Sequence, residues 1–151
     1  MIINTKEIST KIKFSGMILT ILVFLTIVLT FMLKWTNQNQ IILPVLGVYI
    51  LFFVFFFLKK YNYIYYNSEG LKIIFRYSSL LPLSAGNFSI EIPRHDFVNA
   101  EIKSQLSGLR KVLIIYVKTN QGIAKFKPIS LTTLSKKEIE QMMQDIELIK
   151  N

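Results

Sequence analysis

The sequence predicts two membrane-spanning helices that form a hairpin, followed by a small antiparallel β domain that ends in an amphipathic helix. Two long uncharged runs lie in the N-terminal part of the chain, short alternating apolar segments follow, and the C-terminal segment changes to helical spacing. The chain is 52% apolar and 18% charged, which is too apolar for an ordinary soluble domain and too charged for a chain lying wholly in lipid. Two parts in different surroundings are therefore expected.

The two uncharged runs have the lengths of membrane crossings. Residues 14–33 form a run of 20 and residues 41–58 a run of 18. At 1.5 Å per residue these runs reach roughly 30 and 27 Å, close to the thickness of the hydrocarbon core of a bilayer. A cleavable signal peptide would have a shorter apolar region followed by small residues, whereas the first run ends in Lys-Trp. We therefore expect a transmembrane hairpin over residues 14–60, preceded by a cytoplasmic segment over residues 1–13.

The charges beside the runs predict the orientation of the hairpin. Five lysines precede the first run or directly follow the second, and one lies between the runs. By the positive-inside rule both termini face the cytoplasm, as in a multi-pass protein of the cell inner membrane. Basic and aromatic side chains at the ends of the runs suit the membrane surfaces. The expected anchoring residues are Lys13, Lys34, Trp35, Lys59, Lys60 and Tyr61.

Residues 61–151 predict a β domain that follows the second crossing without a flexible linker. Tyrosines alternate over residues 61–66, and residues 67–70 (Asn-Ser-Glu-Gly) supply a turn. One face of the next strand is expected to consist of Leu71, Ile73, Phe75 and Tyr77. The alternation predicts four further strands, over residues 88–92, 97–103, 112–118 and 123–129.

The end of the chain predicts an amphipathic helix over residues 135–150. Ser135 and Glu138 match a capping box, in which each side chain satisfies a free backbone amide of the first turn. Five apolar residues then follow at helical spacing and should cover a face or end of the sheet: Ile139, Met142, Met143, Ile146 and Ile149.

The basic excess of the chain lies mostly beside the crossings. The formal net charge is +9, but residues 61–151 hold 12 Lys+Arg against 8 Asp+Glu, a net +4. A nucleic-acid partner is therefore not expected. The β domain contains two groups of candidate binding residues on predicted hairpins, for which we favour a solvated face first and contact with anionic lipid second: Lys103, Arg110 and Lys111, and Lys125 and Lys127.

The residue types argue against an enzyme. The chain has no cysteine and one histidine, so a nucleophile and base would have to be built around His95, and Asp96 would point away from it if the segment were extended. Glycine-rich phosphate loops and clusters with metal-ligand spacing are missing from the sequence. We expect no catalysis, no cofactor and no metal.

Four segments carry a resemblance to a known family. The sequences YNYIYYNSEGL (61–71), IPRHDFVNAEI (92–102), VLIIYVKTNQG (112–122) and LSKKEIEQMMQDIE (134–147) resemble the bacterial PH-like domains that sit behind a two-helix membrane hairpin, as in the YdbS-like membrane proteins. The resemblance implies a PH-like β domain that binds or assembles and has no established catalysis.

One departure from that family concerns its phosphate-binding loop. PH domains that bind phosphoinositides carry clustered basic residues between their first two strands, whereas residues 67–70, taken as that loop, contain an acid. Head-group recognition of that kind is therefore not expected.

Two hypotheses for function remain. In the first, the domain is an adaptor or a subunit of a membrane complex, and it binds a protein partner or further copies of the chain beside the lipid surface. In the second, the chain is an immunity or regulatory membrane protein that acts against a cognate toxin. Co-purification of a partner would favour the first, and a phenotype that depends on a toxin would favour the second.

Overall fold

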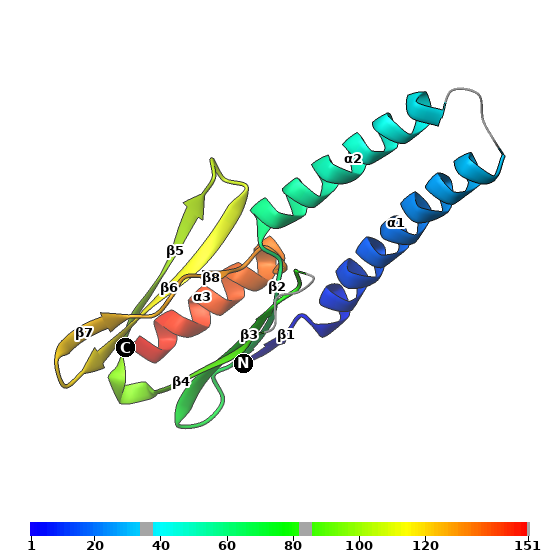
Figure 1. Cartoon of the computed structure of the whole chain (residues 1–151). Helices are drawn as coiled ribbons and strands as arrows, with labels where there is room; N and C mark the ends of the chain where they lie inside the picture. Colours follow the sequence, from blue (N-terminus) through cyan, green and yellow to red (C-terminus); the bar gives the residue numbers. More distant parts are fainter. Residues whose placement is uncertain (34–37, 82–85, 151) are drawn as a thin grey trace.

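Two long apolar helices, two small antiparallel sheets and a C-terminal helix make up the computed structural model, which describes residues 1–33, 38–81 and 86–150 (Figure 1). The expected helical hairpin, antiparallel strands and terminal helix are confirmed, but one strand, β1 (Ile2–Asn4), precedes the hairpin. The two long helices run side by side and project away from the sheets.

The long helices contain the two uncharged runs. α1 spans Lys6–Met32 and α2 spans Gln38–Lys59, so α1 begins eight residues before the first run. Both are long and apolar enough to cross a bilayer, and only 6% of the most apolar stretch of each helix is buried inside the structure. The hydroxyl groups of Thr20 on α1 and Tyr49 on α2 lie 3.2 Å apart and join the two helices.

The first sheet includes a strand that precedes the helices. Its order is β1 (Ile2–Asn4), β2 (Asn62–Asn67), β3 (Lys72–Ser79) and β4 (Asn87–Pro93), with every neighbouring pair antiparallel. The helical hairpin is thus inserted between two adjacent strands of one sheet. Residues 67–70 consequently join the second strand to the third, which corrects their assignment as the loop between the first two strands.

The second sheet is built around β6. β5 (Phe97–Gln105) pairs with one edge of β6 (Arg110–Thr119). The two short strands β7 (Gly122–Lys125) and β8 (Ile129–Ser130) pair with the other edge of β6. The single strand expected over residues 123–129 is therefore wrong. The ladder breaks before Ile129 because Pro128 has no N–H to donate to β6.

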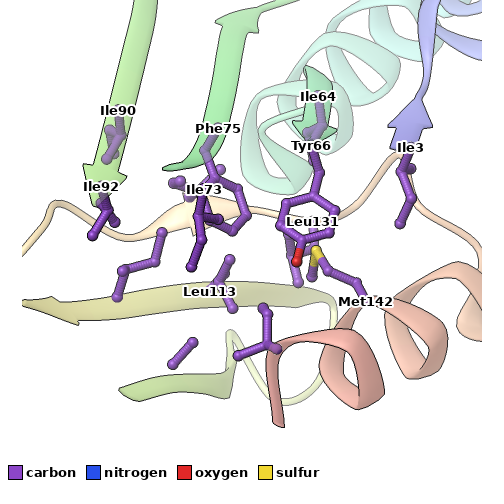
Figure 2. Packing of buried hydrophobic residues seen from close by; sticks show 14 of the residues in the cluster. Ile3, Ile64, Tyr66, Ile73, Phe75, Ile90, Ile92, Leu113, Leu131 and Met142 are labelled. Carbon is purple, nitrogen blue, oxygen red and sulfur yellow. The ribbon is translucent and has the colours of Figure 1, made fainter. Parts of the chain in front are cut away.

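A single apolar core lies between the two sheets and the C-terminal helix (Figure 2). Ile64 and Tyr66 of β2 and Phe75 of β3 pack in the same cluster as Leu113 of β6. The expected core face of β3 is correct for Ile73 and Phe75, and Tyr77 packs against its edge. Leu71 contradicts the expectation, because it lies before β3 and is 89% exposed.

The terminal helix α3 (Lys136–Lys150) begins as the capping box predicts. The amide N of Ser135 donates to Oε2 of Glu138 at 2.7 Å, and the amide N of Glu138 donates to Oγ of Ser135 at 3.2 Å. The predicted apolar stripe closes the core: Ile139, Met142 and Ile146 are buried, and Met143 and Ile149 pack at its edge.

Candidate functional site

The junction between the helical hairpin and the first sheet is held by Thr5, which links β1 to α1 and is 1% exposed. Its amide N donates to the carbonyl O of Ile64 at 3.0 Å, and its Oγ1 accepts from the amide N of Ile64 at 2.8 Å. Thr5 therefore extends the β1–β2 ladder by one residue with its side chain. The start of α1 is fixed to the strand that follows α2.

The end of α2 is fixed to the domain in a similar way. Lys60 takes a left-handed conformation (φ +45°) that ends the helix. The carbonyl O of Lys59 accepts from Oγ1 of Thr132 at 2.8 Å and from Oγ of Ser130 at 3.3 Å. The carbonyl O of Tyr61 accepts from the amide N of Leu80 at 2.9 Å. Hydrogen bonds from both sheets thus set the angle between α2 and the domain.

A cleft of about 520 Å³ opens beside this junction, between the two long helices. Apolar side chains of α1, α2 and the segment after β3 line most of it, including Phe53 and Leu81. Its polar groups are the Thr20 and Tyr49 hydroxyls inside and the exposed Lys13. Such a lining suits an apolar ligand better than a polar substrate.

The residues expected at the membrane surfaces fall in different places. Lys13 lines the cleft, and Lys59, Lys60 and Tyr61 form the α2 junction. The ammonium of Lys59 lies 4.7 Å from the centre of the Phe55 ring and 5.9 Å from that of Tyr61, which is a cation–π geometry. Lys34 and Trp35 lie outside the described residues.

The candidate basic residues do not form one patch. Lys103 lies opposite Val112 and Lys125 opposite Tyr116 on β6, so the two lysines share the sheet face turned away from the core, about 13 Å apart along the strand. Lys111 directly precedes Val112 on β6, so it lies on the opposite face of the sheet. Lys127 lies beyond β7 and is exposed.

Polar neighbours hold two of these basic residues. The ammonium of Lys103 lies 3.6 Å from Oε2 of Glu101, with both side chains largely in solvent. The guanidinium of Arg110 donates to Oε1 of Gln105 across the β5–β6 pair. Of the five candidates, Lys103, Arg110 and Lys111 are brought to a common turn.

His95 and Asp96 differ from the expectation. They lie in a 3₁₀ turn, η1 (Arg94–Asp96), and Nε2 of His95 is 3.4 Å from Oδ1 of Asp96. Asp96 was expected to point away from His95 if the segment were extended, and this condition is not met because the segment is a 3₁₀ turn. The His95 side chain is 80% exposed, so the pair is solvated. Within residues 1–33, 38–81 and 86–150, no group of three His, Cys, Asp or Glu could hold a metal.

A buried tyrosine ties the first sheet to α3. The hydroxyl of Tyr66 donates to Oδ2 of Asp145 at 2.7 Å, and the residue has no exposed surface. Burial raises the pKa of the Tyr66 phenol well above the usual range of tyrosine, and the hydrogen bond to the Asp145 carboxylate raises that pKa further. The neutral phenol therefore stabilises the fold.

We expect the substitution Tyr66→Phe to lower the free energy of unfolding by about 1–2 kcal/mol at neutral pH, because one hydrogen bond to a carboxylate is lost. A raised folded-state pKa gives stability that is complete below the unfolded-state pKa of about 10 and is lost as the pH rises from there toward the folded-state value. The difference in unfolding free energy between the wild-type and Tyr66→Phe chains should therefore shrink above about pH 10. Thermal unfolding at several pH values measures this, and a constant difference would contradict it.

Two polar pairs were not predicted from the sequence. Thr20 on α1 and Tyr49 on α2 lie at similar distances along the chain from the loop that joins the two helices, so they lie at equal depth in an antiparallel hairpin. Pairing residues by their distance from the loop would have found them. The Tyr66–Asp145 pair joins residues 79 positions apart, and its sequence carries no signal of the contact.

The comparisons with known proteins identify no relative. No family model, curated protein or solved structure matches the chain.

Proposed function

We propose that the chain is an integral protein of the cell inner membrane that presents a non-enzymatic binding and assembly domain at the cytoplasmic surface. One observation carries the proposal. A hairpin of two apolar helices is inserted between adjacent strands β1 and β2, and hydrogen bonds fix both of its ends to the domain.

The surface of the helices supports a bilayer location. A helix in a soluble protein carries its apolar residues on one covered face, whereas the most apolar stretches of α1 and α2 are apolar on all sides and only 6% buried. An apolar surface of this extent would cause aggregation in water, and lipid is the solvent that suits it. Core helices of a soluble domain differ from α1 and α2, because the surrounding protein covers their apolar surface.

The position of β1 supports two crossings over a cleaved signal sequence. β1 precedes α1, pairs with β2 and places Ile3 in the core, so removing α1 would also remove part of the domain. Since β1 and β2 are neighbours, α1 leaves the domain and α2 returns to it on the same side of the membrane. The lysines at these two ends favour the cytoplasmic side.

The topology supports a PH-like domain. An antiparallel sheet of four strands, a second sheet beginning with β5 and β6 and a terminal helix agree with the strands and helix that the family resemblance implies, although β1 precedes the hairpin and does not follow it. In this arrangement the helical hairpin takes the place of the loop between the first two strands. A basic phosphate-binding loop of the phosphoinositide type then has no counterpart, so the domain binds by another surface.

Open sheet edges suit the binding of a protein partner or another copy of the chain. Within the described residues, β4 pairs with β3 alone and β5 with β6 alone. Unpaired strand edges accept an added strand from a partner. Fixed placement at the lipid surface would present these edges to neighbouring membrane proteins as an adaptor or complex subunit does.

Affinity purification tests this function. We expect the C-terminally tagged chain, extracted from its native membrane in mild detergent, to elute with a stoichiometric companion or as a discrete homo-oligomer in native mass measurement. An Ile3→Glu chain serves as the control, because it places a charge in the domain core and should lose a companion that the domain holds. A wild-type chain that elutes as a monomer without a companion would contradict the proposal.

A further inference from the structure

The turn between β5 and β6 exposes two leucines. Leu106 and Leu109 are 45% and 47% exposed at the two ends of the turn. Leu106, Ser107 and Gly108 all have positive φ (+52°, +53° and +92°), so the chain reverses within four residues. The turn therefore presents a narrow apolar tip.

Basic residues surround this tip. Lys103 lies on β5 with the Glu101 carboxylate 3.6 Å from its ammonium, and Arg110 and Lys111 begin β6, so three basic residues and one acidic residue lie at this end of the hairpin. Lys103 and Lys111 have opposite parity in the register, so positive charge lies on both faces of the hairpin. An apolar tip with a basic collar is complementary to an anionic lipid surface, where each Lys or Arg gains attraction from the lipid phosphates.

The tip lies at the end of the sheet where α2 meets the domain. The carbonyl O of Lys111 accepts from the amide N of Leu131 at 2.8 Å, and the two neighbours of Leu131, Ser130 and Thr132, both donate to the carbonyl O of Lys59. Lys111 is thus connected to the last residue of α2 through one short segment. Figure 1 shows the β5–β6 turn at the same end of the domain as the lower end of α2.

The β6–β7 turn offers a comparison of similar composition. Ile123 is 69% exposed there, with Lys118 and Lys125 beside it. That turn lies at the opposite end of β6, eight residues or about 26 Å from Lys111, and Figure 1 shows it far from α1 and α2. Exposed apolar and basic residues occur at both ends of β6, but only one end lies near the junction.

We infer that the β5–β6 turn is a third membrane contact, in which Leu106 and Leu109 enter the interface of the bilayer and Lys103, Arg110 and Lys111 bind the phosphates of anionic lipids. The inference rests on the proposed bilayer location of α1 and α2. A contact of this turn with the lipid would support, from a third point, the orientation that the hydrogen bonds at the junction set. The open strand edges would then face a constant direction.

Single-tryptophan chains test the contact. The only tryptophan of the chain, Trp35, is replaced by Phe, and one Trp is introduced at Phe24, Leu109 or Ile123. Each full-length chain is reconstituted into phosphatidylcholine vesicles with phosphatidylglycerol, with and without brominated acyl chains that quench nearby tryptophan. We expect loss of fluorescence for F24W and L109W, no loss for I123W, and weaker quenching of L109W in vesicles without phosphatidylglycerol.

The outcomes distinguish failure of this inference from failure of the proposed function on which it rests. Quenching of F24W without quenching of L109W would overturn the third contact and leave the bilayer location of the helices intact. Equal quenching of L109W and I123W would also overturn it, because the domain would then touch lipid without a preferred face. If L109W were quenched equally with and without phosphatidylglycerol, the part of the inference that assigns phosphate binding to Lys103, Arg110 and Lys111 would be wrong. An unquenched F24W would instead contradict the bilayer location itself.

Discussion

The substitution Ile3→Glu is expected to unfold the two-sheet domain. Ile3 is 5% exposed, lies opposite Tyr66 and packs in the core cluster. A glutamate there loses the apolar contacts and buries an unpaired carboxyl group, at a combined cost on the order of 4 kcal/mol or more. A small domain has about 5–15 kcal/mol of stability in total. Thermal unfolding and limited proteolysis of the detergent-solubilised chain measure the loss.

The neighbouring residue supplies the control. Ile2 is 51% exposed on the other face of β1, so Ile2→Glu changes the same residue type without placing a charge in the core. We expect it to change the free energy of unfolding by about 0.5 kcal/mol or less. If Ile3→Glu unfolded at the same temperature as wild type, or if both variants were equally harmful, β1 would not be a strand of the domain.

Elements whose signal is local could be predicted from the sequence. The uncharged runs place α1 and α2 because an uninterrupted apolar run of about 20 residues is typical of a membrane crossing. Ser135 and Glu138 locate the start of α3 because the capping box is formed entirely within one turn. The turn at Gly122 is correct because glycine accepts its φ of +114° without strain.

Elements whose signal is tertiary could not be predicted. β1 has three residues, too few to show a period, and it is a strand because β2 lies beside it. Leu71 continues the alternation of β3 but lies outside the ladder, after the turn at Gly70. In each case the neighbouring strand, and not the residue pattern, decides the structure.

The candidate basic residues show the same division. Spacing alone places Lys103, Arg110 and Lys111 beside one turn, as the structure has them. The register determines which face each one occupies, and the fold determines that the turn lies near the end of α2. Neither the Glu101 partner of Lys103 nor the Gln105 partner of Arg110 follows from composition.

Cysteine labelling has the largest expected difference between helices that cross a bilayer and helices that lie in water. The chain has no cysteine, so each single-cysteine variant reports one position. Asn39 is exposed at the start of α2, Val48 is 66% exposed in its middle, and Leu71 is 89% exposed in the domain. In water all three would react with a maleimide. In a bilayer, lipid would cover Val48, and Asn39 and Leu71 would lie on opposite sides of the membrane.

Labelling these three variants with a membrane-impermeant maleimide tests the central claim most directly, that the inserted hairpin crosses the bilayer twice and holds the domain on the cytoplasmic side. In right-side-out vesicles we expect Asn39→Cys to react and Leu71→Cys to be protected, with the opposite result in inside-out vesicles. Val48→Cys should react in neither until detergent is added. Reaction of Val48→Cys in intact vesicles, or of Asn39→Cys and Leu71→Cys from the same side, would contradict the claim.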